Sequence, residues 1–122
     1  MCLFCEVNSI MDETPLAYAI YDKFPVTKYH TLIIPKRHVA AYFDLTPQEI
    51  VDIHTLLNKQ QNILVKADLT ILGFNIGINC GQAAGQTIFH CHVHLIPRRI
   101  GDVEKPTGGI RNIIPHKGDY TL

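Results

Sequence analysis

Histidines stand at every second position in one short run near the C-terminal end of the chain: His90, His92 and His94. The residues that alternate with them are apolar: Phe89, Cys91, Val93 and Leu95. Successive side chains of a β-strand point to opposite faces, so this alternation predicts a strand with imidazoles on one face and the core on the other. Imidazoles titrate near neutral pH and serve as nucleophiles, proton carriers or metal ligands. The run therefore predicts a reactive site on a sheet, against two weaker interpretations: a histidine-rich solvated face and a metal site made of these histidines alone.

The segment before the histidines is built from small residues and glutamines. It reads Asn79, Cys80, then Gly-Gln-Ala-Ala-Gly-Gln-Thr over residues 81–87. Glycine leaves backbone N–H groups accessible, and Gln86 and Thr87 can donate hydrogen bonds, as an anion site requires. By itself such a loop is equally typical of an ordinary hairpin connection. Its position beside the histidines favours a phosphate site between the loop and the imidazoles.

Two segments together resemble a known family. The pattern His-φ-His-φ-His-φ-φ, with φ apolar, is similar to that of the histidine-triad (HIT) nucleotide hydrolases and transferases, and residues 85–87 resemble the Gly-Gln-Ser/Thr that precedes their triad. Residues 29–38, Tyr-His-Thr-Leu-Ile-Ile-Pro-Lys-Arg-His, resemble the family segment Gly-His-x-Leu-φ-Ile-Pro-Lys-x-His, with Tyr29 in place of a glycine. The resemblance implies an α+β fold: an antiparallel sheet of about five strands with one long and one short helix.

The resemblance also implies roles for the histidines. His92 would attack the α-phosphorus of a nucleotide and form a nucleotidyl-histidine intermediate, which water then hydrolyses. His94 would bind the phosphate and help to protonate the leaving group, while His90 and His30 would orient the other two. A nucleophilic imidazole must be neutral, and a reference pKa of about 6.5 leaves most of a histidine population neutral at pH 7.

Residues outside the triad are expected to hold the nucleotide. The phosphate-binding residues implied by the resemblance are Asn79, Gly85, Gln86 and Thr87. Asp22 matches the acid that binds the ribose hydroxyls, and an apolar nucleobase pocket is expected at Phe4, with Leu3 and Val7 beside it.

The preferred substrate that we expect is a dinucleoside polyphosphate such as diadenosine tetraphosphate. Arg98, Arg99 and Arg111 favour a long polyphosphate, because guanidinium groups match phosphate geometry, although ordinary surface charge explains them equally well. A nucleoside phosphoramidase, which cleaves a P–N bond, would use the same histidines. A nucleotide-binding module without significant turnover is the alternative from another class. The resemblance implies a homodimer.

A second constellation, Cys2-Leu3-Phe4-Cys5, lies at the start of the chain. Two thiolates at this spacing can hold one side of a tetrahedral zinc ion, which two histidines elsewhere would complete. Some members of the resembled family are similar in this motif and imply His38 and His90 as the partners. Four protein ligands leave no open position, so the zinc would be structural, and no organic cofactor is expected. Unliganded thiols, a disulfide and a redox pair are the alternatives.

Composition and charge argue against several classes of protein. The chain has 122 residues, with 11 basic and 11 acidic side chains and a formal net charge of zero, which argues against a general nucleic-acid or anionic-membrane surface. No apolar run approaches the roughly 18 residues of a membrane span. No secretory signal is recognisable, and its four cysteines are typical of reduced thiols or metal ligands, so a cytoplasmic protein is expected.

The pattern along the chain predicts one HIT domain over residues 1–122, with an irregular tail over 98–122. Residues 16–22, 30–35 and 73–79 are predicted strands. Thr46, Pro47 and Glu49 form a helix start with a capping box, and apolar spacing extends that helix to about Ala67. A short helix is expected over residues 36–43. The apolar tail residues Ile110, Ile113 and Ile114 suggest that the tail docks on another surface.

Overall fold

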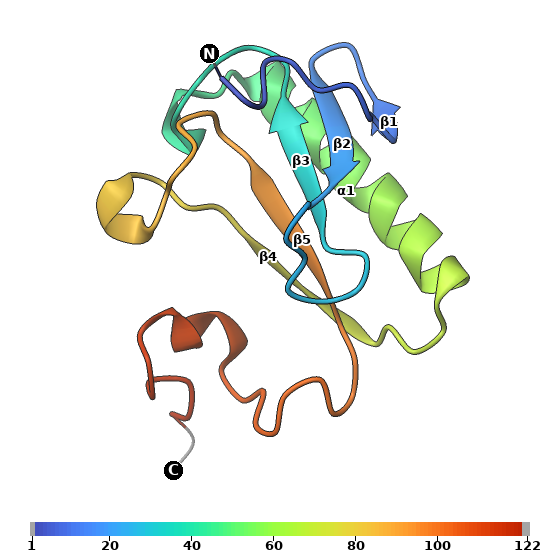
Figure 1. Cartoon of the computed structure of the whole chain (residues 1–122), viewed down its shortest axis with the longest axis vertical. Helices are drawn as coiled ribbons and strands as arrows, with labels where there is room; N and C mark the ends of the chain where they lie inside the picture. Colours follow the sequence, from blue (N-terminus) through green and yellow to red (C-terminus); the bar gives the residue numbers. More distant parts are fainter. Residues whose placement is uncertain (1, 121–122) are drawn as a thin grey trace.

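Five antiparallel strands form one sheet, and a single long helix covers one of its faces (Figure 1). This computed structural model describes residues 2–120. The strands are β1 (Asp12–Glu13), β2 (Ala17–Tyr21), β3 (Thr31–Pro35), β4 (Gly73–Gly77) and β5 (Val93–Arg98), in the spatial order β1-β2-β3-β5-β4. The helix α1 spans Pro47–Ala67, and short 3-10 helices span Tyr42–Asp44, Gln82–Ala84 and Gly109–Ile113. The predicted α+β fold is confirmed.

The long helix begins where the sequence predicts. The Thr46 hydroxyl accepts a hydrogen bond from the Glu49 N–H at 3.1 Å, and the Glu49 carboxylate accepts one from the Thr46 N–H at 2.9 Å. This reciprocal capping box, with Pro47 at the first helical position, satisfies N–H groups that a helix start leaves without partners. The apolar spacing that predicts this helix comes from Ile50, Ile53, Leu57 and Leu64. Ile53 and Leu64 are buried, whereas Ile50 is 38% exposed.

Alternation in the strands separates two apolar layers. Ala17, Ala19 and Ile33 pack beneath α1 against Ile53 and Leu56. The opposite layer consists of Phe4, Tyr18, Ile20, Leu32 and Ile34. Leu32 of β3 pairs with His94 of β5 in the antiparallel register, so His94 lies on this second face. The face that α1 leaves uncovered is therefore the one that carries the histidines.

Two local predictions are wrong. Residues 36–41 form no helix, and the only helical turn nearby is the 3-10 turn at Tyr42–Asp44. The reason lies in backbone pairing: the Val39 carbonyl accepts from the Cys91 N–H at 2.7 Å, so the segment bonds to the chain that enters β5. Phe89, which was expected in the core, is 50% exposed, because β5 does not begin until Val93.

The chain after β5 turns back across the end of the sheet (Figure 1). Its 3-10 turn at Gly109–Ile113 contacts β4, where a Cβ on Gly77 would lie 3.6 Å from Cδ1 of Ile110. Ile110, Ile113 and Ile114 nevertheless remain 56%, 76% and 59% exposed.

A search of the helices within residues 2–120 finds none with the length and hydropathy of a membrane span.

Candidate functional site

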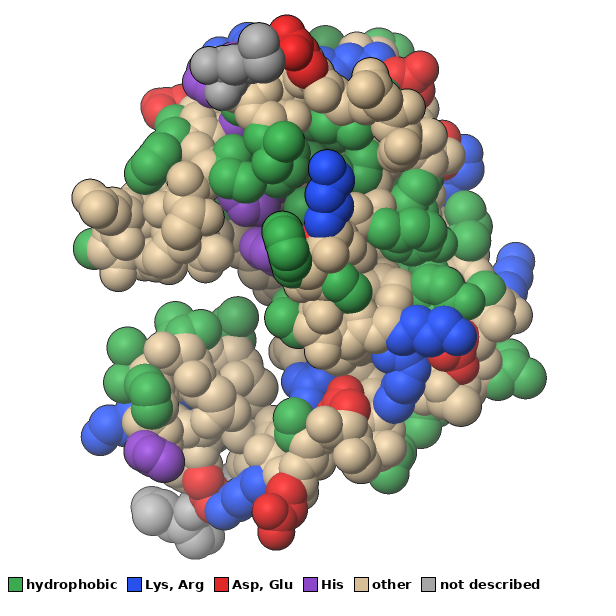
Figure 2. Space-filling model, viewed as in Figure 1, with side chains coloured by type: hydrophobic (Ala, Val, Ile, Leu, Met, Phe, Trp, Pro, Cys, Tyr) green, Lys and Arg blue, Asp and Glu red, His purple; other side chains and the backbone are tan. Residues whose placement is uncertain are grey.

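Only one of the three triad histidines lies on a strand. His94 belongs to β5, whereas His90 and His92 precede the strand. The rings of His92 and His94 stay neighbours, with centroids 5.3 Å apart, while the His90 ring packs edge-on against His38 at 5.1 Å. The single row predicted from alternation is therefore partly wrong. Histidine side chains reach the surface beside a group of hydrophobic side chains near the middle of the uncovered face (Figure 2).

A hydrogen-bonded chain links His94 to the loop between β2 and β3. Nε2 of His30 lies 2.8 Å from Nδ1 of His94 and 3.5 Å from a carboxylate oxygen of Asp22. On its other side, Nδ1 of His30 accepts a hydrogen bond from the Val26 N–H at 3.1 Å. His30 is 2% exposed, so these partners stand in place of water.

The Val26 N–H fixes the tautomers along this chain. Because Nδ1 of His30 accepts a proton from the backbone, neutral His30 carries its own proton on Nε2 and donates it to Nδ1 of His94. Neutral His94 must then carry its proton on Nε2. The arrangement therefore presents His94 as a hydrogen-bond donor.

His92 has the opposite polarity. Its Nδ1 lies 2.8 Å from the carbonyl oxygen of His90, which can only accept, so Nδ1 carries the proton. Nε2 of neutral His92 consequently keeps its lone pair. Adjacent imidazoles thus provide one nucleophilic nitrogen and one donor, which is the pair that a displacement at phosphorus needs.

A cavity of about 560 Å³ adjoins His92 on the uncovered face. Phe4 lines it and also contacts His92, with ring centroids 5.0 Å apart. Leu3, Val7 and Asp22 line it too, so the residues predicted to hold a nucleoside lie around one cavity. Sequence reasoning missed other lining residues: Met11, Ile20, Tyr21, Phe24, Leu32 and Ile88. Alternation within β2 and β3 marks Ile20 and Leu32 as same-face neighbours, but only the strand register places them beside the histidines.

The glycine-containing loop is held together by Gln86. Its side-chain NH₂ donates to the carbonyls of Ala40 and Ile88, and its side-chain oxygen accepts from the Gly81 N–H. All of these groups are engaged within the protein, so Gln86 shapes the loop in this structure. Gly81 and Gly85 have φ values of 92° and 90°, which require glycine.

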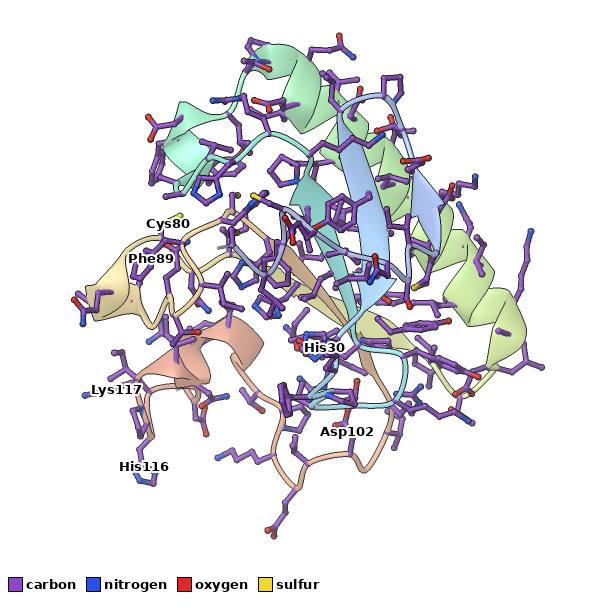
Figure 3. All side chains as sticks on the ribbon, turned by 45° about the horizontal axis from the view of Figure 1, so that its top comes forward. His30, Cys80, Phe89, Asp102, His116 and Lys117 are labelled. Atoms are coloured by element: carbon purple, nitrogen blue, oxygen red, sulfur yellow. The ribbon has the colours of Figure 1, made fainter. Side chains whose placement is uncertain are left out.

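Asn79 and Thr87 flank this loop on its exposed side. Both side chains are exposed, and neither forms a hydrogen bond within residues 2–120. They are therefore the polar side chains of the expected phosphate loop that remain available to an anion. Figure 3 shows how this loop, marked by Cys80 and Phe89, projects from the sheet.

The Cys-x-x-Cys motif folds against His38 and His90. Sγ of Cys2 lies 3.4 Å from Nδ1 of His90, and Sγ of Cys5 lies 3.3 Å from Nδ1 of His38 and 3.5 Å from Nδ1 of His90. The four ligand atoms all lie within 4.8 Å of one another. A tetrahedral zinc ion separates its sulfur and nitrogen ligands by roughly 3.6 Å, so the cluster fits one ion. Nε2 of His90 donates to the Pro35 carbonyl at 2.7 Å, which leaves Nδ1 unprotonated toward the thiols.

The arginines expected near a polyphosphate already have partners. Arg98 donates to both carboxylate oxygens of Asp102, and Arg99 donates to Asp68 at 3.0 Å. Hydrogen bonds from Thr70, and after them the contact with Arg99, lower the pKa of Asp68 to about 2. Arg111 lies over the ring of Tyr120. Direct phosphate binding by the arginines would therefore require exchange of these partners.

Tyr29 stands at a position where glycine is common in the resembled family, and its backbone conformation shows the reason. Its φ is 73°, in the left-handed region that costs a side-chain-bearing residue roughly 1–2 kcal/mol. The ring packs against the apolar cluster around Leu64, Ile71 and Leu95, which offsets part of this cost. The tyrosine lies in the turn just before His30, and His30 still contacts Nδ1 of His94.

The buried histidines predict a loss of stability in mild acid. Burial, followed by the neighbouring His92 and His30, lowers the pKa of His94 to about 4. Below pH 6.5 the unfolded chain binds a proton that the folded chain excludes until about pH 4, so stability falls as pH falls through this window. From pH 7.5 to 5.0 His94 should remove about 2 kcal/mol from the free energy of unfolding, measured with denaturant.

His94→Asn provides the comparison for this measurement. The variant should lose less stability over the same pH interval, since its residue 94 does not titrate. Burial also lowers the pKa of His30 and of His90, so a residual dependence of the same sign should remain. An equal pH dependence in wild type and His94→Asn would contradict the assignment to His94.

Comparison with known proteins agrees with this geometry. The HIT domain model matches residues 7–101. A bis(5'-nucleosyl)-tetraphosphatase (asymmetrical) of Schizosaccharomyces pombe is 39% identical over 95 residues, which cover 78% of this chain and 52% of that protein. The chain thus spans about half the length of this relative.

Solved structures of histidine-triad proteins are also similar to this chain. A HIT family protein from Bacillus anthracis has a TM-score of 0.75 at 40% identity, over 83% of this chain and 75% of that one. A zinc-bound histidine triad family protein from Mycobacterium smegmatis has a TM-score of 0.75 at 34% identity, over 83% of this chain and 77% of that one. The HIT domain model matches more than half of this chain, and the Bacillus anthracis protein is 40% identical over 83% of it. The chain therefore belongs to the HIT domain family.

Proposed function

We propose that this protein is a nucleotide hydrolase that cleaves at an α-phosphate through a covalent nucleotidyl-histidine intermediate, and that its substrate is a dinucleoside polyphosphate of the diadenosine tetraphosphate type. The observation that carries the proposal is the opposite polarity of two adjacent imidazoles. Nδ1 of His92 is bonded to the His90 carbonyl, and Nδ1 of His94 is bonded to His30. Nε2 of His92 is therefore nucleophilic, while Nε2 of His94 is a donor.

In the first step, the lone pair on Nε2 of His92 attacks the α-phosphorus, and the bond from phosphorus to the leaving oxygen breaks. Dividing the reaction in this way avoids direct attack by water on a charged ester. His94 hydrogen-bonds the phosphate through its Nε2–H and gives this proton to the departing oxygen. Water then attacks the same phosphorus and returns a proton to Nε2 of His94, the bond to His92 breaks, and a mononucleotide is released.

The phosphate and the nucleoside have separate candidate sites. Asn79 and Thr87 offer free polar side chains, and Gln86 and Gly85 maintain the loop that carries them. Donors of this kind stabilise charge that develops on the phosphate oxygens. The cavity lined by Phe4 and Asp22 supplies an apolar wall for the base and a carboxylate for the ribose hydroxyls.

The polyphosphate substrate rests on similarity to the S. pombe tetraphosphatase. A turnover panel tests it: diadenosine tetraphosphate, diadenosine triphosphate, ADP and an adenosine phosphoramidate, with products resolved by chromatography. Fast release of a mononucleotide from the dinucleoside polyphosphates is the expected result. Preference for the phosphoramidate would instead establish a phosphoramidase, and absence of all turnover would indicate a binding module.

The relay to His94 predicts a specific effect of a backbone change. Val26→Pro removes the N–H that bonds Nδ1 of His30, whereas Val26→Ala retains it. Without this bond His30 can adopt the other tautomer, in which Nδ1 carries the proton and Nε2 no longer donates to His94. The expected result is a fall in kcat of roughly tenfold or more for Val26→Pro, with a changed pH profile, and little change for Val26→Ala.

A measurement of the histidine tautomers distinguishes loss of the Val26–His30 hydrogen bond from disruption of the loop that contains Val26. Heteronuclear NMR of the imidazole nitrogens reports the tautomers directly and should show Nε2–H on His30 and His94 in wild type and in Val26→Ala. A wild-type spectrum with Nδ1–H on His94 would contradict the relay, whatever the rate of the proline variant.

We further infer a structural zinc site formed by Cys2, Cys5, His38 and His90, supported by their mutual distances and by the zinc-bound M. smegmatis relative. When bound, the ion would supply a cross-link and no open coordination position. Cys2 and Cys5 would tie the N-terminal segment, including Phe4 of the nucleoside cavity, to the chain that carries the triad. His90 would hold the metal by Nδ1 while its carbonyl orients His92.

Two further expectations stay predictions. A single domain over residues 1–122 is consistent with a tail that packs on β4, although the family match ends at residue 101. A homodimer is consistent with β4 at the edge of the sheet and with its exposed Ile76. Sedimentation analysis of the purified protein would test the latter.

A further inference from the structure

The N-terminal wall of the nucleoside cavity has few attachments to the rest of the protein. Residues 3–11 supply half of the residues that line this cavity, and they form neither helix nor strand. Among residues 2–120, two hydrogen bonds join the backbone of residues 2–11 to the rest of the chain. One runs from the Met11 N–H to the Ala19 carbonyl, and the other runs from the Tyr18 hydroxyl to the Phe4 carbonyl at 2.5 Å. The second bond is therefore the one that holds the part of the segment beside His92.

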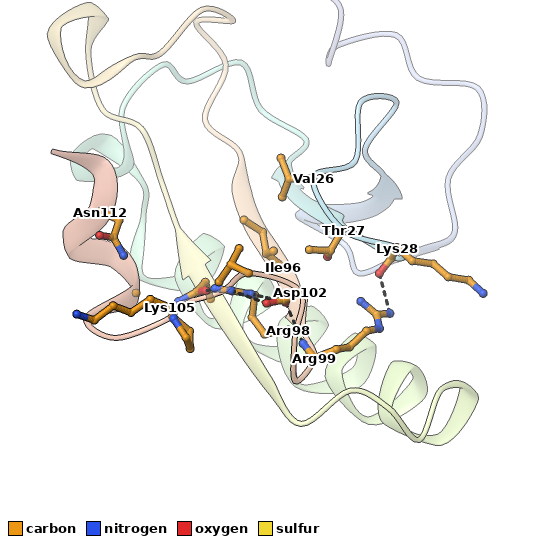
Figure 4. A pocket seen from close by; sticks show the side chains of 13 residues that line it. Val26, Thr27, Lys28, Ile96, Arg98, Arg99, Asp102, Lys105 and Asn112 are labelled. Carbon is orange, nitrogen blue, oxygen red and sulfur yellow. Dashed lines mark hydrogen bonds and ion pairs between the residues drawn. The ribbon is translucent and has the colours of Figure 1, made fainter. Parts of the chain in front are cut away.

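A larger cavity, of about 810 Å³, lies beside β5 and is braced differently (Figure 4). Its lining arginines cross between its walls: Arg98 donates to Asp102, and Arg99 donates to the Lys28 carbonyl. Within the described chain, no ion pair joins two residues that line the nucleoside cavity. The shape of the nucleoside cavity therefore depends more on single contacts such as the bond from Tyr18.

Tyr18 is well placed to be a rigid donor. It lies within β2, which pairs with β1 on one side and with β3 on the other. Tyr18 is 4% exposed and packs in the same apolar cluster as Phe4. Burial, followed by the nearby Cys2 and Cys5, raises the pKa of the Tyr18 hydroxyl, so the hydroxyl keeps the proton that it donates. Tyr18 lies outside the set of residues that line the cavity, so it acts on the cavity through the segment that it holds.

Phe4 connects this hydrogen bond to the site. Its ring lines the nucleoside cavity and lies edge-on to His92, with ring centroids 5.0 Å apart. An aromatic ring offers a nucleobase a flat apolar surface on which to stack. Because a phenylalanine side chain occupies few rotamers, fixing its backbone carbonyl restricts where the ring can lie. His92 has an anchor of its own, since its Nδ1 donates to the His90 carbonyl at 2.8 Å.

We propose that Tyr18 is a positioning residue for nucleotide binding: its hydroxyl holds the Phe4 carbonyl, so that the Phe4 ring is a preformed platform for the base. The proposal rests on the proposed nucleotide hydrolase function and deepens it. It assigns Tyr18 to binding of the base and leaves the chemical step to the histidines. A ligand that lacks a base gains nothing from the platform, so its affinity should not depend on Tyr18.

The test removes one oxygen atom. Tyr18→Phe breaks the bond to Phe4 and retains the aromatic ring in the apolar cluster. Tyr42→Phe is the matched control, because Tyr42 packs on the α1 side of the sheet and its hydroxyl has no hydrogen bond among residues 2–120. The first readout is the Kd of AMP and of ribose 5-phosphate, measured by calorimetry, which requires no turnover. The second readout is KM and kcat for diadenosine tetraphosphate.

For Tyr18→Phe we expect a Kd for AMP that is roughly tenfold weaker, with the Kd of ribose 5-phosphate within about twofold of wild type. KM for diadenosine tetraphosphate should rise by a similar factor, while kcat stays within about threefold, because His92 keeps its own anchor. Tyr42→Phe should change none of these values. Equal weakening of AMP and ribose 5-phosphate would indicate general disruption of the cavity and overturn the proposal. An unchanged Kd for AMP would overturn it as well.

A double-mutant cycle with Phe4→Leu tests whether Tyr18 acts through the Phe4 ring. In the Phe4→Leu background, Tyr18→Phe should weaken AMP binding by less than about threefold, because the platform is already absent. The same tenfold effect in both backgrounds would show that Tyr18 acts by another route and overturn the proposal. If the wild type binds AMP but hydrolyses no dinucleoside polyphosphate, the proposed hydrolase function fails, and the two Kd values and the cycle still decide the role of Tyr18.

Discussion

His92→Ala is expected to lower kcat/KM for diadenosine tetraphosphate by a factor on the order of 10³ or more, as removal of a nucleophile does in other covalent hydrolases. The physical reason is that no neighbouring group can replace Nε2 of His92. His94 presents a donor on its Nε2 because of its bond to His30, and His90 uses Nε2 for the Pro35 carbonyl. Among His30, His90, His92 and His94, Nε2 of His92 is therefore the one lone pair that is directed neither at a backbone N–H, nor at another histidine, nor at the cysteines.

The variant must be distinguished from a misfolded one. His92 is 9% exposed and packs against Phe4, so alanine removes some contacts, while His92→Asn preserves more of the volume. Both should bind a nonhydrolysable nucleotide analogue within a few-fold of wild type. His54→Ala is the matched control and should retain full activity. His54 is exposed on α1, and its side chain bonds only to Asn58 among residues 2–120.

A direct measurement identifies the covalent step. Rapid quenching of wild-type protein with a radiolabelled substrate, followed by mass spectrometry, should locate a nucleotidyl group on His92. Retention of more than a few per cent of activity in His92→Ala, or a label on another histidine, would show that the nucleophile is misassigned. Wild-type binding without any label or turnover would favour the nucleotide-binding module.

Local sequence signals predicted the elements that depend on local chemistry. Thr46, Pro47 and Glu49 form the expected capping box, because each of its bonds joins groups three residues apart. The strand at Thr31–Pro35 was also expected, since its apolar run and flanking residues are contiguous. The proximity of Cys2 and Cys5 to His38 and His90 followed from the family resemblance, as spacing alone named only the two cysteines.

Partners that depend on tertiary structure could not be predicted in this way. Alternation placed His90 in a row with the other triad histidines, but β5 begins only at Val93, and His90 turns toward the thiols. The bond from the Val26 N–H to His30 depends on the path of a loop with a positive φ at Tyr29. The carboxylates that pair with the arginines, Asp102 across a turn from Arg98 and Asp68 distant in sequence from Arg99, could not be identified from the sequence either.

Cys5→Ser is expected to abolish stoichiometric zinc binding and to lower Tm by roughly 10 °C or more, because loss of a structural metal is among the most destabilising single changes. Purification without chelators should yield one zinc per wild-type chain by elemental analysis. Cys2→Ser should behave like Cys5→Ser. Cys80→Ser is the matched control, since Cys80 lies outside the four-ligand cluster and should retain both the metal and the Tm.

The effect on hydrolysis indicates how the zinc site and the triad are connected. His90 joins them, because its Nδ1 faces the thiols while its carbonyl accepts from Nδ1 of His92. A structural ion without an open position should leave the chemical step intact in the fraction of Cys5→Ser that stays folded, with a raised KM because Phe4 loses its anchor. Zinc retained in Cys5→Ser, or absent from the wild type, would contradict the four-ligand site. A large fall in kcat at unchanged Tm would instead show that the cluster acts on His92 through the His90 carbonyl.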